Sequence, residues 1–522
     1  MPETTFFYGE DKLTAKKVLK IASGNILGEL NAQVKAKIRQ SHQWVLNIAE
    51  RDQVVYGINT GFGPLCNTKI SSENTRLLQQ NILRSHAVGV GEPITPLLSK
   101  LMLILKVHAL AMGNSGISIE VLERILWHLK ENVIPVVPEQ GSVGASGDLA
   151  PLAHLFLPLV GLGEVWHHGQ RVPSKGILND FQLDPLELGP KEGLALINGT
   201  QFITAHAVII LDRFYNCLSH ADILGAMMIE ALMGSRKPFH PKLHALRPFP
   251  ANQYVAHRIY NLLEGSQILS SHLNCNRVQD PYSLRCIAQV HGASRAAWLH
   301  LKELLEVELN AVTDNPILID QELTISGGNF HGQPLALPLD YVSLATSELG
   351  NIADRRIYLV LEGSVEGLPK LLMTDTGINS GFMLCQYTSA ALVSENKSMV
   401  YPASADSIPT SLGQEDHVSM GSISSRKALK IVENLEKIQA TELLCAAQAF
   451  DFRRPLKSGV ALEACHNYIR ERIDHAEEDR VFAEDIETSL SIIQEKMLDQ
   501  LVSEQAKAWP QTDSSFLEFE QY

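Results

Sequence analysis

The sequence predicts a mainly α-helical fold, with a long central helical bundle and a smaller N-terminal region that carries short β elements. In the second half of the chain, Trp298, Leu301, Leu305 and Leu309 recur at the spacing of one helix face. Strand-like alternation is scarce there, apart from residues 316–326, which have the pattern of a short hairpin. Long helices joined by small loops are typical of a bundle.

On this pattern the chain divides into a mixed, mostly helical region over residues 1–200 and a long-helix bundle over residues 201–522. An apolar stretch with few polar interruptions predicts a helix over 97–112, closed by the Gly-rich segment 113–116. The other expected elements are, in order, a helical lead-in over 1–50, a helix over 71–84, a small hairpin over 164–173 and a loosely packed polar tail over 508–522.

Composition limits the kinds of partner. The 522 residues are 45% hydrophobic and 20% charged, which is ordinary for a soluble globular protein. The net charge of -14 argues against a nucleic-acid partner, because phosphate binding needs basic patches. Residues 1–24 show no signal-peptide pattern, and charged side chains interrupt the most apolar stretch. We therefore expect a cytoplasmic protein that does not span a membrane.

The cysteines are scattered and form no CxxC pair, so neither a disulfide framework nor a cysteine zinc site is expected. The sequence also contains no P-loop and no ordered dinucleotide-binding glycine motif. These features predict chemistry that requires no metal and no nucleotide.

Residues 141–154 form the stretch around which the rest of the chain is organised. Small and flexible residues up to Gly147 predict a tight bend, and Asp148 then offers a cap for the N–H groups of a following helix. Pro151 suits the first turn of that helix, where its missing donor costs little. The bend therefore leads into a helix N-terminus, which is an electropositive end.

This stretch closely resembles the signature of the aromatic amino acid ammonia-lyases, the family that acts on histidine, phenylalanine and tyrosine. In that family three consecutive residues cyclise without help into 4-methylideneimidazol-5-one (MIO). The resemblance implies that the Gly147 nitrogen attacks the Ala145 carbonyl and that Ser146 loses water to leave an exocyclic methylene. The residue types suit this step, because Gly147 has no Cβ to hinder its nitrogen and Ser146 carries the hydroxyl that leaves.

Motifs on either side of the bend resemble the same family, and the resemblance implies roles for their residues. Tyr56, at the start of the Gly-rich motif 56–63, is expected to be the catalytic base on a lid-like loop. His86, just before a Gly-rich break, is expected to recognise the substrate side chain. Asn198, within the motif 192–200, is expected to contact the MIO group and the substrate carboxylate.

The segment 279–286 in the helical half also matches the family. It offers the amide of Gln279, the phenol of Tyr282 and the guanidinium of Arg285. Arg285 is the natural clamp for a carboxylate, because its planar fork binds two oxygens at once. The resemblance implies that Gln279 binds substrate and that Tyr282 assists MIO electrostatics or proton delivery.

Two further motifs also resemble the family. Phe330 corresponds to a residue that packs beside the MIO group, and Gln414 and Glu415 correspond to substrate-binding residues. A carboxylate at Glu415 gains a charge-assisted hydrogen bond from an imidazole, whereas it would be a buried unpaired charge beside a phenyl ring. His86 and Glu415 therefore make the chain most similar to the histidine branch of the family.

The resemblance implies non-oxidative deamination of L-histidine to trans-urocanate and ammonia. The electrophile would take the substrate amine, Arg285 and Asn198 would fix the carboxylate, and Tyr56 would remove the β-proton. The one cofactor implied is MIO, formed from residues 145–147. The implied partners are a small amino acid substrate and further copies of the chain, in a homotetramer with shared active sites.

Three alternatives stay open at this stage. A tyrosine or phenylalanine ammonia-lyase, or a related MIO aminomutase, would keep the chemistry and change the substrate or product. A catalytically inactive helical scaffold would keep only the fold, but Tyr56, Ser146 and Arg285 are all present. A fumarase-like helical lyase would not need the Ala-Ser-Gly triplet.

Overall fold

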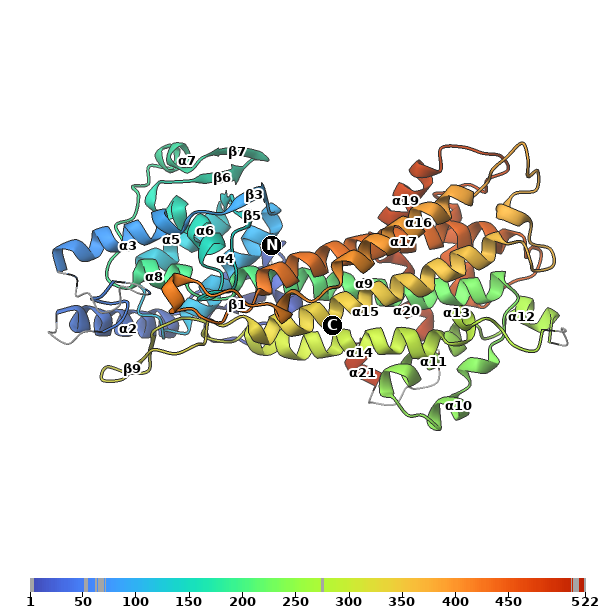
Figure 1. The fold of residues 1–522 in the computed structure, drawn as a ribbon, viewed down its shortest axis with the longest axis horizontal. Coiled ribbons are helices and arrows are strands. Elements are labelled where there is room, and N and C mark those ends of the chain that lie inside the picture. Colours follow the sequence, from blue (N-terminus) through green and yellow to red (C-terminus); the bar gives the residue numbers. More distant parts are fainter. Residues whose placement is uncertain are drawn as a thin grey trace. The chain divides into compact units, whose positions relative to one another are not determined.

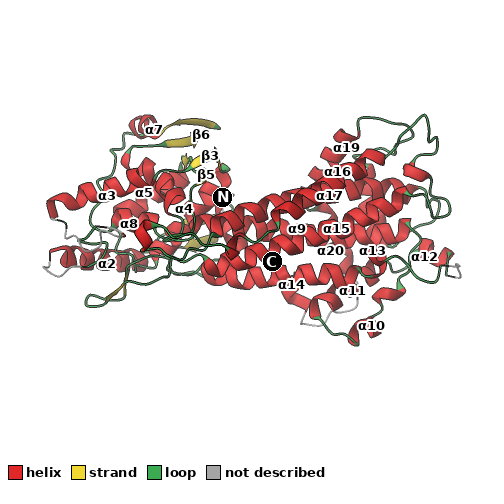
Figure 2. Cartoon of the chain, in the orientation of Figure 1, coloured by secondary structure: helices red, strands yellow, loops and turns green. Residues whose placement is uncertain are grey.

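The computed structural model describes residues 4–50, 55–61, 63, 70, 72–273, 277–507, 509 and 516–520. In this part of the chain helices dominate, and the strands are few and short (Figures 1 and 2). The predicted mainly α-helical fold is therefore confirmed. None of the helices described is both long enough and apolar enough to cross a membrane.

The chain forms two compact units, each discontinuous in sequence. Unit 1 comprises Met1–Ile209, Lys302–Asp340 and Pro402–Arg426, and unit 2 comprises Ile210–Leu301, Tyr341–Tyr401 and Lys427–Tyr522. A single boundary near residue 200 does not describe this division, because two later segments of the chain fold into unit 1. Those segments carry Phe330 and Glu415 into the same unit as Ser146.

Unit 1 contains the apolar helix predicted over 97–112, which is α4 (Pro96–Ala111). Thr95 caps α4 by accepting a hydrogen bond from the backbone N–H of Leu98, and Pro96 occupies the first turn. The other α-helices wholly within this unit are α1 (Ala15–Ala22), α2 (Ala32–Glu50), α3 (Ser72–His86), α5 (Ile119–Lys130), α6 (Leu149–Phe156), α7 (Ser174–Asp180) and α8 (Glu192–Ile197).

The strands of unit 1 form small sheets. They are β1 (Thr4–Phe7) parallel to β2 (Ile26–Glu29), β3 (Val90–Pro93) antiparallel to β5 (Pro138–Gln140), β4 (Ile134–Pro135) and β7 (Gln170–Pro173) on either side of β6 (Glu164–His167), and β8 (Ile317–Leu318) antiparallel to β9 (Thr324–Ile325). The expected hairpins over 164–173 and 316–326 are thus β6–β7 and β8–β9. The helical lead-in expected over 1–50 is wrong in part, because β1 and β2 flank α1, and strands this short show no clear alternation.

Unit 2 contains the bundle of long helices (Figure 1). Its longest members begin or end in unit 1 and have their longer parts in unit 2: α9 (Gln201–Ala231), α14 (Ile287–Glu308), α15 (Gln333–Leu361) and α17 (Gly421–Asp451). The remaining helices are α10 (Pro241–Ala245), α11 (Pro250–Leu262), α12 (Gln267–Ser271), α13 (Tyr282–Arg285), α16 (Met383–Met399), α18 (Val460–Arg470), α19 (Phe482–Gln494), α20 (Met497–Ala506) and α21 (Leu517–Glu520).

Buried side chains join the long helices within unit 2. Trp298 of α14 is fully buried, and its Nε1 donates to the Leu211 carbonyl of α9 at 3.0 Å. Arg356 of α15 donates two hydrogen bonds to Glu442 of α17, and both side chains are fully buried. A buried ion pair is tolerated when each partner is satisfied in this way.

The C-terminal segment packs more firmly than its polar composition predicts. Phe519 of α21 is 3% exposed, and its ring centroid lies 5.5 Å from that of Tyr254. The expectation of a loosely packed tail is therefore wrong for residues 516–520, because the aromatic side chains of Phe516 and Phe519 anchor the segment. Residues 508, 510–515 and 521–522 lie outside the described residues.

Candidate functional site

A cavity of about 440 Å³ in unit 1 brings together Tyr56, His86, Ser146, Asn198 and Glu415. These residues come from separate parts of the sequence: a loop after α2, the end of α3, the bend before α6, the end of α8 and the segment before α17. Apolar residues of α3, α6 and α8 also line the wall. A largely apolar cavity with a few convergent polar groups is typical of a small-molecule site.

The bend before α6 is held in an unusual backbone conformation. Gly144, Ser146 and Gly147 have φ values of 82°, 52° and 79°. Residues other than glycine rarely adopt this region of backbone conformation. A Cβ on Gly144 would lie 2.1 Å from the Ser419 hydroxyl, and a Cβ on Gly147 would lie 2.1 Å from the Gly199 carbonyl oxygen. The close packing therefore requires glycine at both positions, and it holds Ser146 at the cavity.

The Asn198–Gly199 turn lies directly against this bend. The backbone N–H of Asp148 donates to the Gly199 carbonyl at 2.8 Å, and the N–H of Gly199 reaches the Ser146 carbonyl at 3.4 Å. The two segments therefore form a short bridge, and the Ala145–Gly147 triplet is fixed from outside as well as by its own chain.

Asp148 does not cap the helix that follows it, contrary to the expectation from sequence. Its side chain makes no capping bond to α6, and Oδ2 instead accepts from the N–H groups of Phe202 and Ile203, both at 3.0 Å. These groups belong to the first turn of α9, so Asp148 caps a helix distant in sequence. Asp148 is fully buried, and this burial raises its pKa to about 7.

Glu415 reaches the triplet through its carboxylate. Ser146 Oγ donates to Oε1 at 3.0 Å, while Thr410 Oγ1 and Ser411 Oγ donate to Oε2 at 3.0 and 2.7 Å. Hydrogen bonds to an ionised carboxylate are stronger than those between neutral groups. The carboxylate is therefore oriented by hydroxyl groups and faces the cavity beside Ser146.

His86 ends α3, and its Nδ1 lies 3.0 Å from Ser85 Oγ. Partial burial lowers the pKa of His86, although a hydrogen bond with the Ile82 carbonyl and the charge of Glu415 partly oppose this shift. The lowered pKa favours the neutral imidazole, and because Nδ1 lies beside Ser85 Oγ, Nε2 is the ring nitrogen that can contact a ligand.

Tyr56 begins the loop that carries the first motif. Its hydroxyl accepts from the N–H of Gly63 at 3.4 Å. Gly57 has a φ of 72°, and a Cβ there would lie 2.4 Å from the Leu194 side chain, so this turn also requires glycine. Phe62 lies outside the described residues. Within the described loop, the phenol of Tyr56 lines the cavity.

Asn198 is buried at the end of α8. Its Nδ2 donates to the carbonyls of Leu194 and Asn315 at 3.1 and 3.4 Å. Both amide hydrogens are thus engaged, so a contact with a substrate carboxylate would require one of these bonds to be exchanged. Its main-chain carbonyl accepts a hydrogen bond from the ammonium of Lys106.

Gln279, Tyr282 and Arg285 form a group of their own in unit 2 and do not line the cavity described above. Arg285 Nη2 donates to Gln279 Oε1 at 3.0 Å, and its guanidinium carbon lies 4.4 Å from the centroid of the Tyr282 ring. Tyr282 is 70% exposed. Arg285 is half-buried against the Tyr282 ring, and together with Gln279 it lines a separate cavity of about 820 Å³ in unit 2. Its role as a carboxylate clamp stays a prediction.

Phe330 and Gln414 belong to unit 1, but they do not line the cavity either. Phe330 is half-buried in the loop between β9 and α15, and Gln414 is exposed one residue before Glu415. Ala145 and Gly147 flank Ser146 in the bend. Ala145 is buried against Val418 and Met420.

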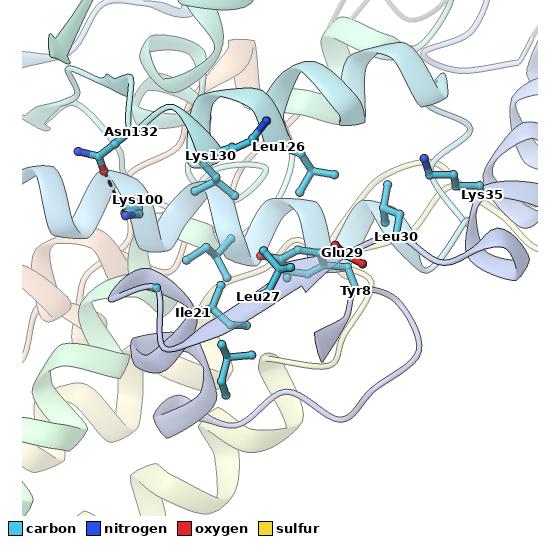
Figure 3. A pocket seen from close by; sticks show the side chains of 15 residues that line it. Tyr8, Ile21, Leu27, Glu29, Leu30, Lys35, Lys100, Leu126, Lys130 and Asn132 are labelled. Atoms are coloured by element: carbon cyan, nitrogen blue, oxygen red, sulfur yellow. Dashed lines mark hydrogen bonds between the residues drawn. The ribbon is translucent and has the colours of Figure 1, made fainter. Parts of the chain in front are cut away.

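A larger cavity in unit 1, of about 870 Å³, carries none of the predicted site residues (Figure 3). It is lined mainly by apolar side chains of β2, α4 and α5, with Lys100 on α4 donating to Asn132 at 3.1 Å. Among the described residues, no group of three or more His, Cys, Asp or Glu side chains could hold a metal ion.

Two features beside the site are not predicted from the sequence. They are the burial of Lys106 and the capping of α9 by Asp148. Lys106 was visible only as an interruption of an apolar stretch. In the structure it is 1% exposed, and burial lowers its pKa to about 7. A charged residue inside an otherwise apolar helix indicates a buried interaction, since such residues are seldom buried without a partner.

Comparison with known proteins gives a consistent result over most of the chain. The family model described as "Aromatic amino acid lyase" matches residues 13–471. A histidine ammonia-lyase from Natranaerobius thermophilus is 47% identical over 499 residues, which are 95% of this chain and 98% of that protein.

Two solved structures share the fold with a TM-score of 0.90. The crystal structure of histidine ammonia-lyase from Trypanosoma cruzi is 37% identical and covers 99% of this chain and 97% of its own. A tyrosine aminomutase from Streptomyces globisporus is 33% identical, with 97% and 99% coverage. Because the two structures superpose equally well, the fold by itself does not distinguish their reactions.

Proposed function

The chain belongs to the aromatic amino acid lyase family, and we propose that it eliminates ammonia from L-histidine to give trans-urocanate in the cytoplasm. One observation carries the choice of substrate: the cavity that holds Ser146 also holds the Glu415 carboxylate and a neutral His86. An imidazole ring offers an N–H donor and a nitrogen acceptor, and these two side chains complement it. The identity to histidine ammonia-lyases supports the same substrate.

Proteins of this family use MIO, and the bend before α6 fits its formation. The backbone at Ser146 and Gly147 is already turned to positive φ, and the contact with Gly199 leaves no room for a side chain on Gly147. Residues Ala145, Ser146 and Gly147 would form the group, which supplies an electrophile for the substrate amine. Ring formation removes the Ser146 hydroxyl, so Oε1 of Glu415 would lose that donor and become available to the substrate.

Tyr56 is the group we propose to take the β-proton. A free phenol has a pKa of roughly 10, so the ionised form needs nearby positive charge or a hydrogen-bond donor. The N–H of Gly63 already donates to this oxygen. A loop that carries the base over the cavity would also exclude water during the reaction.

The carboxylate of the substrate needs a cation that the cavity lining does not contain among its described residues. We propose that the protein is a homotetramer with shared active sites, in which the Gln279–Tyr282–Arg285 group of one subunit serves another. Mixing two inactive variants, Ser146→Ala and Arg285→Ala, tests this by complementation. Activity in the refolded mixture supports shared sites, whereas a mixture as inactive as its components contradicts them.

The proposed function is tested by the ultraviolet absorbance of trans-urocanate after addition of L-histidine, with L-tyrosine and L-phenylalanine in parallel. We expect a signal with L-histidine that is lost in Ser146→Ala. A signal only with an aromatic substrate would move the protein to the tyrosine or phenylalanine branch. Conversion of an α- into a β-amino acid would make it an aminomutase, and a folded but inert protein would support the scaffold alternative.

A further inference from the structure

Lys106 is a buried lysine that the proposed reaction does not use. Lys106 on α4 and Lys191 before α8 are 1% and 0% exposed. Lys191 forms an ion pair with Asp314 at 2.6 Å. For Lys106, in contrast, no carboxylate among the described residues lies within 4.0 Å of Nζ, and the ammonium donates to the main-chain carbonyl of Asn198. A fully buried amino group is thus directed at a backbone carbonyl, the one hydrogen-bond acceptor found for it among the described residues.

That carbonyl lies at a position where a cation is favourable. Asn198 directly follows α8, and its own N–H closes the last turn of the helix by donating to the Leu194 carbonyl at 3.0 Å. Carbonyls at a helix C-terminus have no partner within the helix and carry partial negative charge. The ammonium of Lys106 therefore both satisfies this carbonyl and fixes the direction in which the chain leaves α8.

The turn that Lys106 holds contacts the Ala145–Ser146–Gly147 triplet and also lines the cavity. Gly199 accepts from the N–H of Asp148 and donates toward the Ser146 carbonyl, while Asn198 lines the cavity. The bond from Asn198 Nδ2 to the Asn315 carbonyl holds the same turn from another side. A small rotation of this turn would move the contact against the triplet and the Asn198 amide together.

We infer that Lys106 is a positioning residue, whose ammonium holds the Asn198–Gly199 turn so that the Ala145–Ser146–Gly147 triplet can cyclise and Asn198 faces the substrate. Cyclisation joins the Gly147 nitrogen to the Ala145 carbonyl carbon. The carbonyl oxygen leaves as one water molecule and the Ser146 hydroxyl as a second. The part of the inference that concerns Asn198 rests on the proposed function, whereas the part that concerns the triplet does not.

The test compares Lys106→Met with Lys106→Arg. Methionine keeps an apolar chain of similar length and removes the cation, while arginine restores a cationic donor. Mass spectrometry of the peptide that contains residues 145–147 measures the fraction that has lost two water molecules. We expect Lys106→Met to lower this fraction and to reduce kcat/KM per cyclised subunit about 100-fold, as expected for a misplaced site group, with partial rescue by arginine.

Lys100→Met is the matched control. Lys100 lies on the same helix, and its ammonium contacts Asn132 beside the other cavity (Figure 3). This variant should keep the wild-type cyclised fraction and kinetics. A folded Lys106→Met protein with both readouts at the wild-type level would overturn the inference.

One more variant and one result with wild-type protein separate a failure of the Lys106 inference from a failure of folding or of the proposed function. If Lys106→Met does not fold, Lys106→Gln retains an N–H donor without the charge, and its cyclised fraction must fall below that of Lys106→Arg. If wild-type protein is cyclised but does not convert L-histidine, the proposed function fails. The mass measurement on the Lys106 variants then still decides whether this residue positions the triplet.

Discussion

Replacing Asp148 by asparagine should make the stability of the protein less dependent on pH. In the folded chain the Asp148 carboxyl is fully buried, and burial raises its pKa from 3.8 to about 7. The raised pKa means that the folded state holds a proton that the unfolded state has already released between these pH values. The stability contributed by this group is therefore fully present below pH 3.8 and is lost as the pH rises through about 7.

The size of the change in stability follows from the pKa shift of Asp148. About three pKa units at 1.36 kcal/mol each correspond to roughly 4 kcal/mol, which is an upper value because unfolding also relaxes the surroundings. Asparagine is close in shape, and its Oδ1 can still accept from the N–H groups of Phe202 and Ile203. Its Nδ2 can donate to Ser142, whose hydroxyl now donates to Asp148. The variant thus removes the buried charge and keeps the cap of α9.

Urea unfolding of wild type and Asp148→Asn, followed by circular dichroism at several pH values, measures this difference. The difference in free energy of unfolding, Asp148→Asn minus wild type, should be near zero at about pH 4. It should reach up to roughly 4 kcal/mol at about pH 8. Asp148→Ala serves as the control. Compared with Asp148→Asn, it leaves two buried N–H groups of α9 unpaired and should be less stable by about 1–3 kcal/mol for each at every pH. A difference between Asp148→Asn and wild type that does not change with pH would refute the reasoning.

Three further outcomes can be checked with the same protein. Glu415→Gln should lower kcat/KM for L-histidine by about 10- to 100-fold, because an amide gives a weaker hydrogen bond than the carboxylate, and urocanate absorbance measures it. Gly147→Ala should reduce the cyclised fraction seen by mass spectrometry, since its Cβ would lie 2.1 Å from the Gly199 carbonyl oxygen; an unchanged fraction would contradict the described packing. Because burial lowers the pKa of His86, an NMR titration of the substrate-free protein should show this ring titrating below pH 6.5, with the signal absent in His86→Gln.

Sequence determined the features of this protein that depend on neighbouring residues. The helical spacing of Trp298 and Leu301 predicted their burial, and the apolar run over 97–112 predicted α4. The small residues around Ser146 predicted a tight bend, and the backbone there does adopt positive φ. These predictions succeed because conformational preferences and helical periodicity act over a few positions along the chain.

Tertiary structure decided which of those residues meet. Ser146 and Glu415 are 269 positions apart, and their hydrogen bond exists only because residues 402–426 return to unit 1. Because of the same packing, Asp148 caps α9 rather than α6, which follows it in the chain, and Lys106 donates to the Asn198 carbonyl. No local pattern reports such pairings, since a buried polar group takes whichever partner the packed chain brings within reach.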